Sequence, residues 1–333
     1  MSWIITVDGF GVMEYVNLGS AGVKVSRICI GCMSFGNDAP WKLELEQAKV
    51  IVKRAIDLGI TFFDTANVYS LGRSEEIIGE CLKDYRDDMV VATKVYYEMS
   101  EKPNDGGLSR RHVFQQIHAS LKRLNMSHVD LYQIHRWDPE TSIEETLRTL
   151  DDLVHQGLTR YIGASTMHAW QFLSALSTSE RLGLEKFISM QNHYNLVYRE
   201  EEREMIPLCR AEGIGVIPWS PLARGFLAGK YKRGGTPSSV RYKSDHYLPD
   251  RYFRQEDFDV LEVVGELAKE KGVSMAQIAL AWLLHKGVTS PIIGPTKVEH
   301  IEEAVSALEV KLSSDDMERL ESKYKPHPIL GFD

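Results

Sequence analysis

The sequence predicts an α/β fold, a (β/α)8 TIM barrel with an N-terminal β-hairpin plug and extra C-terminal helices. Eight short apolar runs with strand character are followed by stretches of amphipathic helix, which is the repeat of such a barrel. The 333 residues exceed the roughly 250 that a barrel needs. A doubly wound open sheet is the rival fold, but no G-x-G-x-x-G follows the first apolar run.

Predicted strands and helices alternate along most of the chain. The strands are 27–32, 60–64, 89–94, 129–134, 159–164, 188–192, 214–218 and 291–294. The helices are 43–58, 74–84, 109–124, 142–156, 168–180, 200–211, 257–271, 274–286 and 297–307. The fourth helix shows the expected pattern of apolar residues three or four positions apart, at Ile143, Leu147, Leu150 and Val154. Gly157 then ends it.

Three segments add to the barrel. Residues 14–26 are predicted to form a hairpin that plugs its bottom, and residues 312–322 form one more helix. Residues 222–256 form a long polar loop, and loops of this length usually act as lids or binding loops. Because no segment resembles a linker, residues 13–333 are predicted to be a single domain. Residues 1–12 are an N-terminal extension with no assigned function.

Composition excludes several classes of partner. The net charge of −8 argues against nucleic acid and anionic membranes. No apolar run approaches the ~20 residues of a membrane span, and the N-terminus lacks the features of a signal peptide. These features predict a soluble cytoplasmic protein.

Four cysteines are too few and too scattered for a disulfide framework. Cys29 and Cys32 form a C-x-x-C within a strand-like run, where side chains three positions apart face opposite sides. No second Cys or His pair has the spacing of a zinc site. No metal is therefore predicted.

Four polar residues stand at or just after predicted strands. Asp64, Lys94 and His135 end or follow the second, third and fourth strands, and Tyr69 lies in the loop after the second. Catalytic groups of such barrels come from the carboxyl ends of several strands. An acid, a phenol, an amine and an imidazole at these positions point to reduction of a carbonyl group.

The chemistry of the four groups supports this interpretation. A free phenol has a pKa near 10, and a cation at ~4 Å lowers a neighbour's pKa by about three units when the effective dielectric is about 20. Lys94 is therefore expected to lower the pKa of Tyr69, while Asp64 keeps the amine charged. His135 would orient the substrate carbonyl. Each residue alone has an ordinary structural explanation, but four together are hard to explain in that way.

Further motifs resemble one known family. They are GITFFDTA at 59–66, YSLGRSE at 69–75, DLYQIH at 130–135, GAS at 163–165, PWSPL at 218–222 and IGPT at 293–296. From about residue 14 to 324 the chain closely resembles the aldo-keto reductase superfamily, in its bacterial or archaeal type related to potassium-channel β-subunits. The resemblance implies Tyr69 as the general acid, assisted by Asp64, Lys94 and His135. The channel subunits often have Asn at the His135 position, so His135 favours the enzymes.

The resemblance also implies NADP(H), bound in an extended conformation without a Rossmann motif. Ser165 and Gln191 would bind the nicotinamide carboxamide, and Trp219 would stack on its ring. Three further groups of cofactor-binding residues are implied. At the end of the first strand they are Gly31, Cys32 and Met33, and around the pyrophosphate they are Ser220, Pro221, Leu222, Arg224, Gly225, Lys230 and Arg241. Around the adenosine they are Gly294, Thr296, Lys297, His300 and Glu303.

Two departures from the family pattern matter for the cofactor. Thr166 replaces a common Asn, and His300 replaces the Arg of relatives that firmly prefer NADP. Lys297 is expected to compensate for the missing arginine, so that NADP(H) is favoured over NAD(H).

The substrate is predicted to be a small aldehyde or ketone with some apolar body. The residues expected to line its pocket are Met33, Phe35, Trp41, Tyr96, Tyr97, Arg136 and Trp137. Arg136 hints at an anionic or dicarbonyl substrate, although an outward salt bridge is the favoured interpretation.

Two alternatives remain open. One is a regulatory or redox-sensing protein that binds the cofactor but turns over poorly. The other is a Schiff-base aldolase with Lys94 as its nucleophile. The sequence predicts neither the physiological substrate nor the oligomeric state.

Overall fold

The computed structural model describes residues 3–7, 11–235, 242 and 251–331. Eight strands form one parallel sheet in the order β10-β9-β8-β7-β6-β5-β4-β11. Strands that follow one another in the sequence are therefore neighbours from β4 to β10, and the last strand, β11, pairs with the first, β4. They are β4 (Cys29–Gly31), β5 (Phe62–Asp64), β6 (Val90–Val95), β7 (Val129–Ile134), β8 (Thr159–Ser165), β9 (Ser189–Gln191), β10 (Gly215–Val216) and β11 (Ile292–Ile293).

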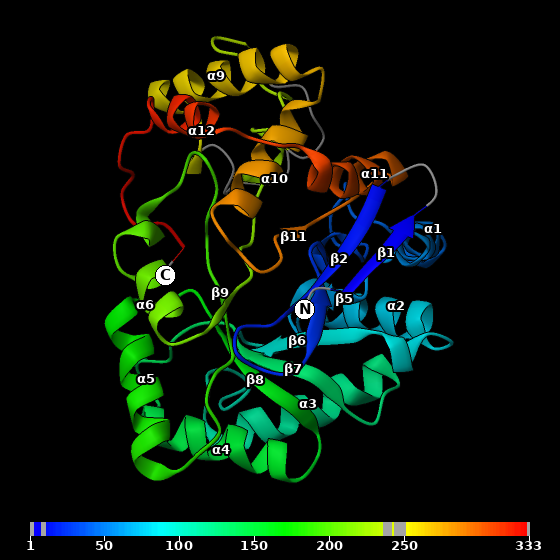
Figure 1. The fold of residues 1–333 in the computed structure, drawn as a ribbon. Coiled ribbons are helices and arrows are strands. Elements are labelled where there is room, and N and C mark those ends of the chain that lie inside the picture. Colours follow the sequence, from blue (N-terminus) through cyan, green and yellow to red (C-terminus); the bar gives the residue numbers. More distant parts are fainter. Residues whose placement is uncertain (1–2, 8–10, 236–241, 243–250, 332–333) are drawn as a thin grey trace.

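Backbone hydrogen bonds close this sheet into a barrel. Thr289 N–H donates to the Val216 carbonyl at 2.8 Å, and Ile292 N–H donates to the Pro218 carbonyl at 2.9 Å. The helices lie around the strands (Figure 1). They are α1 (Leu45–Asp57), α2 (Arg73–Leu82), α3 (Arg110–Leu124), α4 (Ile143–His155), α5 (Ala169–Leu182), α6 (Met205–Ala211), α9 (Gln255–Lys271), α10 (Met275–His285), α11 (Val298–Ser306) and α12 (Ser314–Glu321). The predicted barrel with extra C-terminal helices is confirmed.

Local signals set the ends of these helices. The Ser142 hydroxyl accepts a hydrogen bond from Glu145 N–H at 3.2 Å and caps α4, and Gly157 follows the helix with φ of 72°. The predicted helix 200–211 is instead a 3-10 turn (Glu200–Glu202) followed by α6. Pro207 explains the break, because proline has no N–H and is accepted only in the first turn of a helix.

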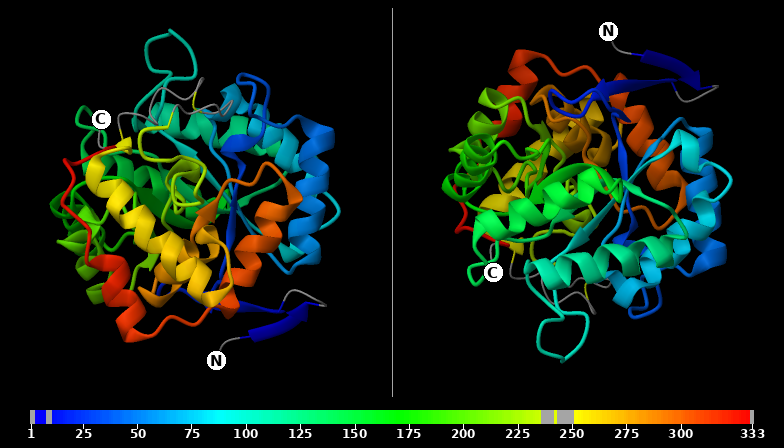
Figure 2. Two further views of the ribbon diagram at one scale, coloured as in Figure 1. Left: turned by 90° about the horizontal axis from the view of Figure 1, so that it is seen from above. Right: turned by 90° about the horizontal axis from the view of Figure 1, so that it is seen from below.

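A hairpin closes one end of the barrel, as predicted. β2 (Gly11–Asn17) pairs antiparallel with β3 (Lys24–Ser26), and β1 (Trp3–Val7) extends the same small sheet. Leu18 and Val25 from this hairpin are buried in a cluster with residues of the barrel interior, namely Cys29, Phe62, Ala92, Leu131, Ile217 and Ile292. Figure 2 shows these N-terminal strands at the opposite end of the molecule from the loop that follows β6.

The C-x-x-C residues face opposite sides of the sheet, as predicted, with Cys29 in β4 and Cys32 directly after it. Cys29 packs in the barrel interior, whereas Cys32 belongs to the layer between the strands and the surrounding helices. Both thiols are free, and burial raises the pKa of each well above its ordinary value. Among the helices in the described part of the chain, none is long and apolar enough to cross a membrane.

Candidate active site

The four predicted catalytic residues meet at the carboxyl end of the barrel. Asp64 is the last residue of β5, Lys94 lies near the end of β6, and His135 directly follows β7. Because neighbouring strands run parallel and in register, their last residues reach the same end. Tyr69 begins a 3-10 turn (Tyr69–Gly72).

Gly72 fixes the turn that carries Tyr69. Its φ is 96°, a region that side chains disfavour, and a Cβ there would lie 2.5 Å from Cδ of Arg123. Only glycine therefore allows the chain to turn into α2 at this point, with the Tyr69 ring held over the strand ends.

Lys94 connects the acid to the phenol. Its Nζ donates to Asp64 Oδ2 at 2.6 Å, to the Thr65 carbonyl at 2.8 Å and to the Tyr69 hydroxyl at 3.3 Å. Lys94 is 0 % exposed and Asp64 is 2 % exposed, so this is a buried ion pair with a phenol on its open side. The three-way contact is the arrangement expected for carbonyl reduction.

Two glutamines complete the coordination of Asp64. Gln133 Nε2 and Gln191 Nε2 each donate to Asp64 Oδ1 at 2.9 Å, and Gln191 Nε2 also lies 3.2 Å from Gln133 Oε1. Both oxygens of the carboxylate are thus occupied, so that the charge can stay buried beside Lys94. Gln133 was not predicted as a site residue. Its position as a polar residue inside an otherwise apolar strand could have indicated that it belongs to the site.

His135 stands beside Tyr69 and a second tyrosine. Its ring lies edge-on to Tyr69 at 5.8 Å and to Tyr97 at 4.9 Å between centroids. Its Nδ1 is buried and, within the described residues, has no hydrogen-bond partner. Burial, Lys94 and Arg136 lower its pKa well below the ordinary value, so the imidazole is neutral at neutral pH.

The expected lowering of the Tyr69 pKa is wrong. Burial raises the pKa of Tyr69 more than the charge of Lys94 lowers it, so the pKa lies above its ordinary value. Burial also acts to lower the pKa of Lys94, but Asp64 and Tyr69 outweigh it and the pKa of Lys94 is raised. At neutral pH the site therefore holds a protonated phenol beside a charged amine.

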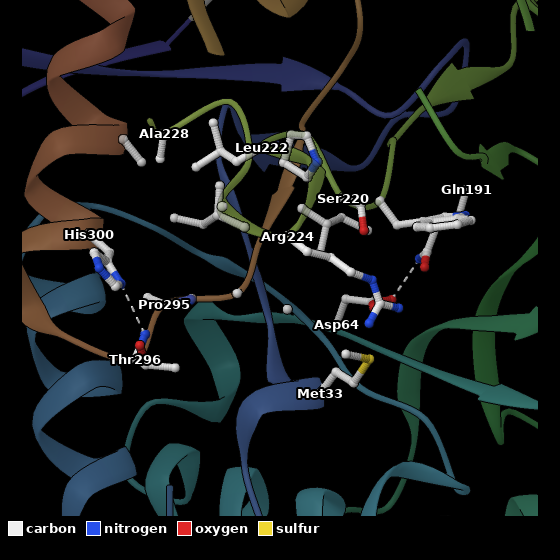
Figure 3. A pocket seen from close by; sticks show the side chains of 18 of the residues that line it. Met33, Asp64, Gln191, Ser220, Leu222, Arg224, Ala228, Pro295, Thr296 and His300 are labelled. Atoms are coloured by element: carbon white, nitrogen blue, oxygen red, sulfur yellow. Dashed lines mark hydrogen bonds between the residues drawn. The ribbon is translucent and has the colours of Figure 1, made fainter. Parts of the chain in front are cut away.

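A cavity of about 600 Å³ opens over these residues. Figure 3 shows Asp64 and Gln191 at one end of it and Thr296 and His300 at the other. The predicted residues that line it are Gly31, Met33, Trp41, Asp64, Tyr69, Tyr97, His135, Arg136, Ser165, Gln191, Trp219, Ser220, Pro221, Leu222, Arg224, Gly225, Lys230, Gly294, Thr296, His300 and Glu303.

Other predicted residues do not line the cavity. Phe35 and Cys32 are fully buried in the outer core, and Lys94 lies behind the lining residues Asp64 and Tyr69, to which it donates hydrogen bonds. Lys297 is exposed at the start of α11 and is not among the residues that line the cavity, although its charge acts to lower the pKa of His300, which does line it. Tyr96 and Trp137 pack against the core and do not line the cavity either. The prediction for Arg241 falls outside the described residues.

The cavity also has lining residues that were not predicted. They are Val68, Ala228, Tyr231, Arg251, Ala276, Leu280, Ile292, Ile293, Pro295 and Ala304. Ala276 and Leu280 lie one turn apart on α10, whose nearly all-apolar sequence marks it as buried but does not show which face meets a cavity. Arg251 lies at the far end of the long loop, where its neighbours in the sequence give no sign of the contact.

A model of the aldo/keto reductase family matches residues 27–325. The chain belongs to this family. A Schizosaccharomyces pombe protein provisionally named an aryl-alcohol dehydrogenase is 44% identical to it, over 95% of this chain and 97% of the relative. Versiconal hemiacetal acetate reductase of Aspergillus parasiticus is 41% identical, over 95% and 98%. An aldo-keto reductase of Metarhizium robertsii is 42% identical, over 96% and 93%. Family and relatives together identify an oxidoreductase acting on carbonyl groups or alcohols.

Residues that would hold the nicotinamide end of a cofactor are tied to one another. The Ser165 hydroxyl donates to the Gln191 carbonyl at 2.8 Å. Trp219 Nε1 donates to the Thr166 hydroxyl at 3.0 Å, so the threonine that departs from the family pattern positions the indole. The Trp219 ring stacks on His193 at 4.1 Å between centroids.

The middle and far end of the cavity carry positive charge and hydrogen-bond donors. Arg224, Lys230 and Arg251 all line it. At the far end Thr296 N–H donates to His300 Nδ1 at 3.3 Å, which leaves Nε2 as the protonated nitrogen of a neutral ring. Burial and the nearby charge of Lys230 lower the pKa of His300. This elongated, cation-lined cavity fits a phosphorylated dinucleotide such as the cofactor of this family.

Proposed function

We propose that this chain reduces small aldehydes and ketones to alcohols with NADP(H) as the hydride donor. The observation that carries the proposal is the buried contact of Lys94 Nζ with Asp64 and with the Tyr69 hydroxyl, at 2.6 and 3.3 Å. It places a proton donor beside a fixed positive charge at the wall of a cavity.

Each residue has a defined role in this proposal. The cofactor, when bound, supplies the hydride that adds to the carbonyl carbon. Tyr69 hydrogen-bonds to the carbonyl oxygen and gives it a proton as negative charge develops there. Lys94 stabilises the phenolate that remains, and Asp64 keeps Lys94 charged and fixed. His135, as a neutral imidazole, hydrogen-bonds to the same oxygen and orients the carbonyl.

NADP(H) rather than NAD(H) is part of the proposal. Lys230 lies close enough to His300 to lower its pKa, so a positive charge stands beside the ring at the far end of the cavity. Lys297, whose charge also acts to lower that pKa, keeps the part predicted for it, with Lys230 as a second positive charge. The prediction of a cytoplasmic protein stays part of the proposal, supported by four free cysteines, as is usual in a reducing compartment.

A kinetic experiment tests the proposal. Oxidation of NADPH is followed with a panel of aldehydes, ketones and dicarbonyls, using the wild type and Tyr69→Phe. We expect Tyr69→Phe to lose about a hundredfold or more of kcat, because general acid catalysis contributes about that much. Binding of NADPH, measured by fluorescence titration, should stay close to wild type.

Tyr161→Phe is the matched control, because Tyr161 lies on β8 at the plugged end and does not line the cavity. Wild-type activity in Tyr69→Phe would contradict the proposal. Tight NADPH binding without turnover of any carbonyl would instead support the regulatory alternative. The aldolase alternative has no support, since it needs a neutral, accessible amine and Lys94 is fully buried with a raised pKa.

A further inference from the structure

Arg136 places a second positive charge in the catalytic end of the cavity. It directly follows His135 and lines the cavity. Its Nη1 donates to the His135 carbonyl at 2.6 Å, and its guanidinium carbon lies 5.5 Å from the centre of the Tyr97 ring. Tyr97 in turn contacts the His135 ring. The guanidinium is therefore held by a backbone carbonyl and an aromatic ring rather than by an acid.

No carboxylate pairs with Arg136 within the described part of the chain, so an outward salt bridge is not the interpretation that these residues support. Asp64 is occupied by Lys94 and the two glutamines. Asp138, two residues along the chain, accepts hydrogen bonds from Leu108 N–H and the Thr141 hydroxyl. The nearby acids are thus satisfied elsewhere.

Part of the guanidinium is also desolvated. The Nε atom of Arg136 is buried and has no hydrogen-bond partner among the residues described. A guanidinium carries five N–H groups in one plane, and one of them is used by the His135 carbonyl. Since a partly buried cation without a counter-ion is costly, a ligand that supplies a carboxylate would be bound strongly there.

We propose that Arg136 is the anion subsite of the substrate pocket and binds a carboxylate carried by the carbonyl substrate. The substrate class is then a small formyl- or oxo-carboxylate, with its reactive carbonyl at Tyr69 and His135 and its acid group at Arg136. Tyr97 and Trp41, which line the same cavity, provide aromatic walls for the body between the two groups. This inference rests on the proposed carbonyl reduction and names its substrate class.

The test compares acids with neutral esters of the same shape. For the ortho, meta and para isomers of carboxybenzaldehyde and their methyl esters, kcat/KM is measured in wild type, Arg136→Met and Arg136→Lys. The acid-to-ester ratio within one variant removes any general effect of Arg136 on Tyr69 or His135. We expect wild type to prefer the acid of at least one isomer, and Arg136→Met to lower that ratio about ten- to hundredfold. Arg136→Lys should keep part of the preference, because lysine retains the charge but not the planar fork.

A binding measurement separates this inference from the proposed function. Benzoate and the neutral benzamide are titrated calorimetrically into each variant in the presence of NADPH, after circular dichroism has shown that the variant is folded. Benzoate binding that is tighter than benzamide binding, and that is lost in Arg136→Met, supports the anion subsite even if no substrate turns over. Acid-to-ester and benzoate-to-benzamide ratios that are the same in wild type and Arg136→Met overturn it, even if every aldehyde is reduced.

Discussion

At the scale of single residues, burial decides the protonation of the site more than charge does. Lys94 touches the Tyr69 hydroxyl, yet the pKa of Tyr69 lies above its ordinary value because the ring is removed from water. A phenol that keeps its proton is a ready acid for reduction, whereas the reverse reaction needs the phenolate as a base. The two directions should therefore respond oppositely to pH.

We expect kcat/KM for reduction to stay constant through the neutral range, because Tyr69 keeps its proton there. It should fall only above pH 10, where Tyr69 begins to lose that proton, because its pKa is raised above the ordinary value. His135 adds no loss near neutrality, because its pKa is lowered and it becomes charged only well below pH 6.5. Alcohol oxidation should rise steadily with pH over the same range. Initial rates in both directions across a buffer series check this. A fall of the reductive rate between pH 7 and 9 would show that Tyr69 has a lowered pKa after all.

At the scale of elements, the site depends on contacts between the loop after β9, the segment after β10 and the C-terminal end of the long loop that was predicted at 222–256. Tyr198, His193 and Trp219 form a column of parallel rings, with both pairs of centroids 4.1 Å apart. His193 Nε2 is hydrogen-bonded to the Tyr252 hydroxyl at 2.7 Å. Burial and Arg251 lower the pKa of His193 well below its ordinary value, so the central ring stays neutral. The column fixes the plane of Trp219 at the cavity wall.

Removing the central ring should weaken cofactor binding. We expect His193→Ala to raise the NADPH dissociation constant about tenfold, because the stacked contact with Trp219 is lost together with the one that connects the column to Tyr198. His193→Phe keeps a ring in place and should retain most of the affinity. Fluorescence titration measures both. Phe172→Ala is the control, because it removes a stacked pair with Phe187 in the core between α5 and the barrel, away from the cavity. Equal weakening in the Phe172 and His193 variants would mean that the column has no specific role.

For the molecule as a whole, the sequence was sufficient to predict the barrel and to predict that Asp64, Tyr69, Lys94 and His135 meet at its carboxyl end. Both follow from local signals: apolar runs that form strands, and polar residues where those runs end. Contacts made by long loops, or between residues far apart in the sequence, could not be predicted from such local signals. Arg251 at the cavity and the exposed position of Lys297 depend on how whole segments pack. The direction of the Tyr69 pKa depends on the extent of burial, which spacing along a chain does not give.

The two ends of the barrel should be separable by mutation. Leu18 fills the plugged end, and only Ile292 belongs both to its cluster and to the cavity lining within the described residues. Between them lies the polar layer of Asp64, Gln133 and Gln191. We expect Leu18→Ala to lower the free energy of unfolding by about 2–5 kcal/mol, as is usual for a cavity left in a core, and to leave kcat/KM and the NADPH dissociation constant unchanged. Urea denaturation and initial rates measure the two effects, with the 58 % exposed Val50 replaced by alanine as the control. A loss of activity in proportion to the loss of stability would show instead that the hairpin and the catalytic residues form one mechanical unit.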